Sequence, residues 1–126
     1  MFVTSLRKSR NMEKIKGLID APFTPMLPNG EVNYEPIQAY ADLLVRNGLK
    51  GVFINGSSGE GYLLSDEERM KLAECWIQAV PKDFKVIVHV GSTCVKASRK
   101  LAAHETCSTC RRNRSMGHWS DGNSFS

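Results

Sequence analysis

An α/β fold with parallel strands is predicted by three observations on this 126-residue sequence. Three short apolar runs begin at Leu18, Val52 and Val86, so they are spaced 34 residues apart. A stretch with helical periodicity follows each run. The two later runs are apolar throughout, as strands buried on both faces are. A strand–helix unit repeated at constant length indicates parallel strands joined by right-handed crossovers, in either an open sheet or a barrel.

The first unit consists of a strand at residues 17–21 (GLIDA) and a helix from about Tyr34. Between them, Pro22 and the Asn-Gly pair of TPMLPNG are typical of a loop. Asn33 stands where it could cap the helix, and Gly48 where it could end it.

The second and third units follow the same plan. A strand at residues 51–55 (GVFIN) precedes a helix that should begin with a capping box of Ser65 and Glu68 and end at Pro81. A strand at 85–90 (KVIVHV) precedes a helix from about Val95. The two unusual residues in these elements are expected to be structural: Cys75 as a buried or half-buried thiol and His89 as a hydrogen-bonded strand residue.

The net charge of +4 comes from the two ends of the chain, because residues 12–104 contain eleven basic and eleven acidic side chains. A neutral body disfavours nucleic-acid binding. No apolar run reaches the roughly 20 residues of a membrane span, and the first residues lack the apolar core of a secretory signal. We therefore expect a cytoplasmic protein with no membrane or nucleic-acid partner and with reduced cysteines.

The loop NGSSGEG at residues 55–61 is the candidate site, because parallel α/β proteins bind ligands at the carboxyl ends of their strands. Gly56 and Gly59 would let the backbone turn tightly, and Ser57 and Ser58 offer hydroxyl and N–H donors to a small anion. The loop lacks the lysine of a P-loop and reverses the glycine order of a dinucleotide fingerprint. The alternative is a turn whose serines only satisfy nearby backbone groups.

Two segments, GLIDAPFTPMLPNGEVNYEPIQAYADLLVRNGLKGVFINGSSGEGYLLSDEERMKLAE and KVIVHVGS, together resemble the N-acetylneuraminate lyases. These are the sialic acid aldolases of the dihydrodipicolinate synthase superfamily. The resemblance covers about residues 13–104 and includes the motif G-[ST]-[ST]-G-E at residues 56–60. It implies an α/β fold that is a partial TIM (β/α)8 barrel, namely its first three βα units.

The resemblance also implies a chemistry. Such enzymes cleave N-acetylneuraminate reversibly to N-acetylmannosamine and pyruvate through a Schiff base between pyruvate and a lysine. The two hydroxyl residues of the motif hold the carboxylate of pyruvate. The resemblance thus assigns substrate binding to Ser57 and Ser58, with Gly56, Gly59 and Glu60 supporting the loop.

The chain departs from the family in its extent, since a complete barrel needs eight units and about 250 residues. No lysine here, including Lys85 and Lys96, matches the Schiff-base motif, so no catalytic residue, metal or cofactor is assigned and the chain alone is expected to be inactive. Its full-length relative is expected to form homo-oligomers. Two alternatives stay open: another pyruvate-dependent class I aldolase such as dihydrodipicolinate synthase, or a truncated isoform that binds a partner through its third strand.

Both ends of the chain lie outside the resemblance, as an N-terminal extension at residues 1–12 and a tail at 105–126. A zinc site of His104, Cys107, Cys110 and His118 is disfavoured, because no second ordered ligand pair accompanies the two cysteines. Read one nucleotide later, the codons of Met116-Gly117 must give Trp and those of Trp119-Ser120 must give Gly, as the family's next segment requires. We therefore expect the tail to be an out-of-frame product of a lyase gene, or disordered.

Overall fold

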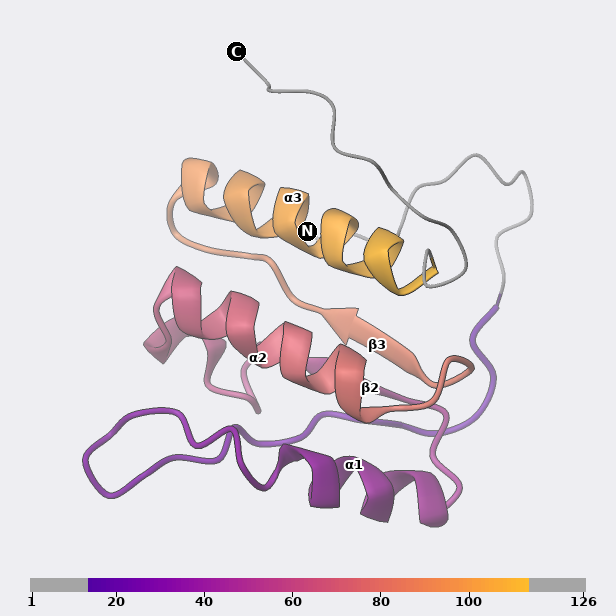
Figure 1. Ribbon diagram of the computed structural model, residues 1–126. Helices are drawn as coiled ribbons and strands as arrows, with labels where there is room; N and C mark the ends of the chain where they lie inside the picture. Colours follow the sequence, from indigo (N-terminus) through magenta and orange to yellow (C-terminus); the bar gives the residue numbers. More distant parts are fainter. Residues whose placement is uncertain (1–13, 114–126) are drawn as a thin grey trace.

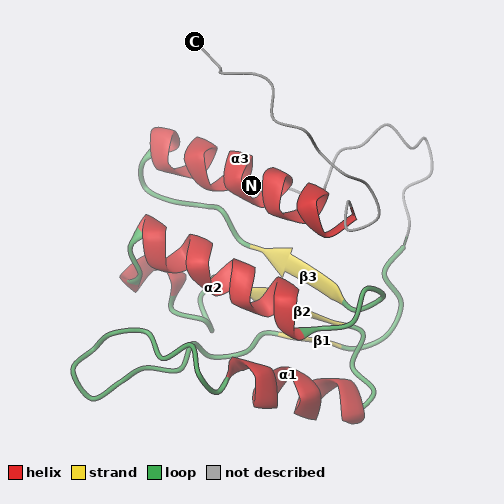
Figure 2. Cartoon of the chain, in the orientation of Figure 1, coloured by secondary structure: helices red, strands yellow, loops and turns green. Residues whose placement is uncertain are grey.

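The computed structural model describes residues 14–113, with side chains as far as Thr106. Three strands form one parallel sheet in the order β1-β2-β3. Three helices lie side by side against this sheet, with α2 between α1 and α3 (Figure 1; Figure 2). The predicted α/β class with parallel strands is therefore confirmed. In chain order the elements are β1 (Ile19–Asp20), α1 (Ile37–Arg46), β2 (Gly51–Ile54), the short 3-10 helix η1 (Gly61–Leu63), α2 (Asp66–Ala79), β3 (Lys85–Val88) and α3 (Val95–Asn113).

The strand register corrects the predicted constant spacing. Ile19, Gly51 and Lys85 lie opposite one another, so equivalent positions are 32 and then 34 residues apart. The predicted starts Val52 and Val86 do lie opposite each other, but the partner of Val52 on β1 is Asp20, two residues after the predicted start at Leu18. Gly51 belongs to the strand, where a Cβ atom would lie 2.5 Å from the carbonyl oxygen of Lys85.

Helix α1 begins at Ile37, which is three residues later than predicted. Asn33 does not cap it: the Asn33 Oδ1 atom accepts from the N–H of Glu35 at 3.1 Å, in a turn that precedes the helix. The predicted end is confirmed. Gly48 has a φ of +79°, and its N–H donates to the carbonyl of Val45, as in the glycine-terminated ends of many helices.

Helix α2 has the predicted capping box. Ser65 Oγ accepts from the N–H of Glu68 at 3.1 Å, and Glu68 Oε2 accepts from the N–H of Ser65 at 2.8 Å. The helix buries Leu72 and Trp76 against the sheet, where they join Val52 and Ile54 of β2 in the core. Burial of such side chains contributes roughly 1.5–3 kcal/mol each.

Helix α3 begins at Val95 as predicted and continues past His104 to Asn113. The boundary expected at residue 105 thus falls inside a helix, and Glu105 is buried. Residues 1–13 and 114–126, which include the predicted N-terminal extension and most of the predicted tail, lie outside the described residues. Among the helices described, none has both the length and the apolar character needed to cross a bilayer.

Candidate functional site

The loop at residues 55–60 connects β2 to η1 and α2, so it lies at the carboxyl end of the central strand. Because the sheet is parallel, the segments that follow β1 and β3 reach the same end. The loop at 55–61 contains one ionisable side chain, the exposed Glu60. An anion bound here would therefore meet neutral donors.

Ser57 and Ser58 are both exposed at this end of the sheet. Within residues 14–113, neither hydroxyl has a hydrogen-bond partner, and no acceptor takes the backbone N–H of Ser57, Ser58 or Gly59. This arrangement differs from a turn whose serines satisfy nearby backbone groups. It leaves five donors, two hydroxyls and three N–H groups, without an acceptor among the described residues.

The loop is closed by two backbone hydrogen bonds. The N–H of Glu60 donates to the carbonyl of Ser57 at 3.1 Å, and the N–H of Gly61 donates to the carbonyl of Gly56 at 3.0 Å. Asn55 and Glu60, at either end, have φ values of +60° and +53°. Asparagine tolerates this left-handed region better than most residues do.

The glycines act differently from the prediction, because none of Gly56, Gly59 and Gly61 has a positive φ. They are needed for close packing instead. A Cβ at Gly56 would lie 2.4 Å from the Phe53 ring, and a Cβ at Gly61 would lie 2.0 Å from the carbonyl oxygen of Asn55. Their lack of a side chain lets the loop fold back onto the end of β2.

Three buried polar side chains, which the sequence analysis missed, surround the loop. Thr24 Oγ1 donates to the carbonyl of Gly59 at 2.7 Å, and Asn55 Nδ2 donates to the carbonyl of Arg69 at 3.1 Å. A sequence signal exists for Arg69, which stands three and four residues before Leu72 and Ala73 and hence on the apolar face of α2. Thr24 and Asn55 have no comparable signal.

The guanidinium of Arg69 contacts the segment after β3. Its Nη2 donates to the carbonyl of His89 at 2.6 Å and its Nη1 to the carbonyl of Gly91 at 2.9 Å. Burial lowers the pKa of Arg69, while the carboxylates of Asp66 and Glu105 oppose that shift. The group stays protonated regardless, because arginine is not deprotonated in proteins.

His89 and Cys75 occupy the structural positions that were expected. His89 is half-buried, its N–H donates to the carbonyl of Ile54 at 3.0 Å, and its ring centroid lies 6.1 Å from that of Phe53. Cys75 is half-buried on α2, and burial raises the pKa of its thiol.

Of the four side chains considered for zinc, only His104 lies among the described side chains. Its Nε2 is 2.9 Å from Glu74 Oε1 and its Nδ1 is 3.3 Å from Glu105 Oε1. Cys107, Cys110 and His118 fall outside the described side chains. Among the side chains that are described, no three metal-ligating groups gather at one point.

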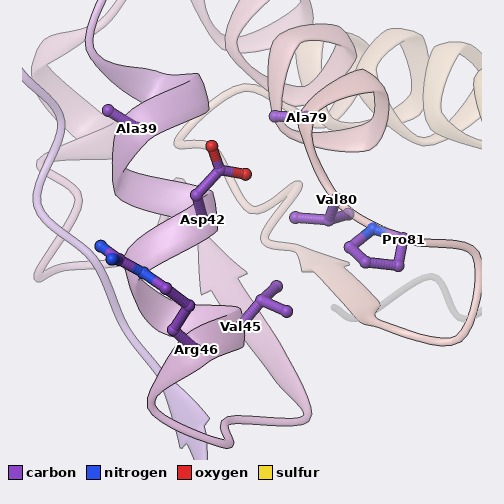
Figure 3. Close-up of a pocket in the computed structure, with 7 residues that line it drawn as sticks. All are labelled: Ala39, Asp42, Val45, Arg46, Ala79, Val80 and Pro81. Carbon is purple, nitrogen blue, oxygen red and sulfur yellow. The ribbon is translucent and has the colours of Figure 1, made fainter.

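A groove in the described part of the chain lies away from this loop. A groove of about 750 Å³ lies between α1 and the end of α2 (Figure 3), lined by Ala39, Asp42, Val45, Arg46, Ala79, Val80 and Pro81. Helices that follow parallel strands run back along them, so this groove lies at the amino ends of the strands. We place the candidate site at the serine loop, because the donors gather there.

The sequence matches the Dihydrodipicolinate synthetase family over residues 14–109. Since this match covers most of the chain, the chain belongs to that family.

Its relatives include N-acetylneuraminate lyases. Over 94 residues it is 46% identical to N-acetylneuraminate lyase of Mus musculus and 47% identical to N-acetylneuraminate lyase A of Xenopus laevis. Those matches cover 73% of this chain but 29% and 31% of the two relatives. The chain therefore spans less than a third of their length.

Solved structures give the same result. Proteus mirabilis N-acetylneuraminate lyase aligns with a TM-score of 0.71 and 39% identity over 73% of this chain and 31% of its own. Dihydrodipicolinate synthase from Aquifex aeolicus aligns with a TM-score of 0.69 and 30% identity over 75% of this chain and 32% of its own. The structure is accordingly a partial TIM barrel, with three βα units.

Proposed function

We propose that this chain carries the pyruvate-carboxylate site of an N-acetylneuraminate lyase, with Ser57 and Ser58 as the residues that bind the carboxylate. One observation supports this most strongly: the exposed donors of both serines gather at the carboxyl end of the central strand, in the loop that has the family motif. Gly56, Gly59 and Glu60 support the loop, because the first two allow its close packing and Glu60 closes its turn.

The chemistry explains why a lyase would need neutral donors at this point. Cleavage through a Schiff base requires the keto carbon of pyruvate to be held within reach of a lysine amine. Fixing the carboxylate at the other end of the molecule supplies that orientation. Hydroxyl and N–H donors bind the anion without adding a second cation near the imine.

Among pyruvate-dependent aldolases, the lyase is favoured over dihydrodipicolinate synthase. The two vertebrate lyases are 46% and 47% identical to this chain, whereas the Aquifex aeolicus synthase is 30% identical. The substrate proposed for the whole protein is therefore N-acetylneuraminate. Cytoplasmic localisation, homo-oligomers of the full-length relative, and the absence of nucleic-acid or membrane partners stay predictions from the sequence.

The 126 residues alone are expected to lack lyase activity. A barrel requires eight βα units, and residues 14–113 supply three of them. No lysine of this chain matches the family's Schiff-base lysine. Partner binding by a truncated isoform stays a prediction.

The test is a chimera in which residues 13–104 replace the matching segment of the Mus musculus lyase. We expect the chimera to release pyruvate from N-acetylneuraminate, and the 126-residue chain to release none. In the synthetic direction, Ser57→Ala and Ser58→Ala should each raise the KM for pyruvate about tenfold or more, as expected for losing a hydrogen bond to a charged group.

Ser92→Ala is the matched control, because Ser92 is an exposed serine in the segment after β3. Its KM for pyruvate should stay close to that of the unmodified chimera. A folded chimera whose KM for pyruvate ignores both loop substitutions would refute the assignment.

A further inference from the structure

Three buried polar side chains connect the segments at the carboxyl ends of all three strands. Thr24, Asn55 and Arg69 are 5%, 2% and 3% exposed, which is rare for residues that carry hydrogen-bonding groups. Most buried polar groups are hydrogen-bonded, and each of these side chains makes at least one hydrogen bond, although Asn55 Oδ1 and Arg69 Nε have no partner among the described residues. Each of the three donates to main-chain carbonyls: Thr24 to that of Gly59 in the loop, and Asn55 to that of Arg69. Arg69 donates to the carbonyls of His89 and Gly91.

Arg69 joins the second and third strand ends through its own backbone and side chain. Its backbone carbonyl accepts from Asn55 in the serine loop, and its guanidinium donates to the carbonyls of His89 and Gly91. The two guanidinium nitrogens reach carbonyls two residues apart, which a planar fork can do and a lysine ammonium cannot do with the same geometry.

Asn55 fixes the start of the loop. Its backbone has a φ of +60°, and its side chain is held by the bond to Arg69. Gly61 packs so closely on the Asn55 carbonyl that a Cβ there would lie 2.0 Å away. Any rotation of Asn55 would therefore shift both ends of the segment that presents the two serines.

Thr24 fixes the far side of the loop. Its hydroxyl donates to the carbonyl of Gly59, directly after Ser58. At Gly59 a Cβ would lie 3.4 Å from the carbonyl oxygen of Pro22, so the loop and the segment after β1 are in close contact. The loop is thus held from the first, second and third units at once.

We propose that Arg69 is the positioning residue of the serine loop: its guanidinium fixes the first turn of α2 on the segment after β3, which holds the Arg69 carbonyl in place for Asn55, and Thr24 assists. The loop's four-residue turn then has one geometry, in which the donors of Ser57 and Ser58 converge on one anion. That the anion is a pyruvate carboxylate rests on the proposed function. The hydrogen bonds that connect Thr24, Asn55 and Arg69 are independent of the proposed function.

Hydrogen exchange measured on the full 126-residue chain tests the connection without any ligand. The amides of Glu60 and Gly61 are hydrogen-bonded within the loop and report its opening. Arg69→Lys, which keeps the charge, and Asn55→Gly, which keeps the positive φ, should each speed exchange at these amides about tenfold, the ratio that corresponds to one lost hydrogen bond. Amides in the middle of α2 should change far less.

Leu44→Ala is the control, because it removes buried apolar contacts of α1 far from the loop. It should speed exchange across the core without singling out Glu60 and Gly61. If Arg69→Lys speeds hydrogen exchange at amides throughout the chain, the substitution has lowered the stability of the whole fold. Asn55→Gly and the near-isosteric Thr24→Val then test whether these hydrogen bonds hold the serine loop. Exchange at Glu60 and Gly61 that is unchanged in these two variants would overturn the proposal.

Pyruvate affinity separates positioning from general stability. In the folded Arg69→Lys chain, the Kd for pyruvate should rise several-fold, whereas Leu44→Ala should leave the Kd unchanged while the chain is folded. If the unmodified chain does not bind pyruvate, the proposed function fails and the exchange result still stands. If pyruvate binds equally well to both variants and exchange is unaltered, Arg69 has no positioning role.

Discussion

Two ionisable side chains are buried between α2 and α3, and each carries an atom whose hydrogen-bonding capacity is unmet. Arg69 has Nε and Glu105 has Oε2 without a partner among the described residues. The nearest groups to Glu105 are His104 beside it on α3 and Arg69 and Glu74 on α2. A buried polar atom without a partner costs about 1–3 kcal/mol. Because the Glu105 carboxyl can also gain or lose a proton, folding stability should respond to pH at this residue.

Glu105→Gln is predicted to stabilise the chain at neutral pH relative to wild type, because it keeps the shape of the side chain and removes a buried charge. Burial raises the pKa of Glu105 above 4.5, although its hydrogen bond to His104 opposes the shift. As the pH rises from below 4.5 through the raised pKa, the folded state keeps a proton that the unfolded state has lost. The stability of the wild type therefore falls over that window.

Urea unfolding of wild type and Glu105→Gln across this pH range measures the difference. The advantage of the variant should shrink toward acid pH, where Glu105 is protonated in both states. Glu35→Gln is the control, because Glu35 is exposed. A constant difference between wild type and Glu105→Gln at all pH values would contradict the prediction.

For the candidate site, the sequence pointed to the residues that belong to a motif and missed the buried polar residues around them, which depend on packing. Ser57 and Ser58 follow an apolar strand in a glycine-rich loop, so local pattern was sufficient to find them. Asn55 and Thr24 act through contacts with chain segments 14 and 35 residues away, which no local pattern reports. Arg69 could have been found, because it interrupts the apolar face of α2.

At the scale of elements, helix α2 matters most, because it packs between α1 and α3 and carries Arg69. Its start is set by the capping box of Ser65 and Glu68, directly before the first turn that contains Arg69. The position of the guanidinium therefore depends on where this helix begins.

Ser65→Ala is predicted to lower the free energy of unfolding by about 1 kcal/mol, because it removes the acceptor for the N–H of Glu68. Urea denaturation followed by circular dichroism measures the loss. Ser98→Ala, within α3, should change stability much less because it removes no cap. A Ser65→Ala chain as stable as wild type would mean that the cap does not set the start of α2.

Element types were predictable from the sequence, but their ends were less so. The capping box of α2 and the glycine end of α1 are local, and both predictions were confirmed. The start of α1 was wrong, because Asn33 forms a turn with Glu35 instead of a cap. The register of the first strand was wrong by two residues, because Asp20 and not Leu18 lies opposite Val52, and a strand of two residues gives little local pattern to fix its register.

At the scale of the whole molecule, the described residues form three consecutive βα units of a barrel. The chain spans 29–31% of the lyases of Mus musculus and Xenopus laevis, yet it includes the loop that has the family motif. The carboxylate site proposed here is formed from within these three units, since the second holds both serines and the first and third hold the loop in place. Binding of the carboxylate and catalysis should therefore be separable.

Titration of the isotopically labelled 126-residue chain with pyruvate, followed by the amide signals of Ser57, Ser58 and Gly59, tests the central claim most directly. We predict saturable shifts at these amides with a millimolar Kd, equivalent to roughly 4 kcal/mol. Pyruvamide, which lacks the negative charge, should not produce them. Equal shifts with pyruvamide, or pyruvate shifts confined to the groove at Asp42 and Arg46, would contradict the account.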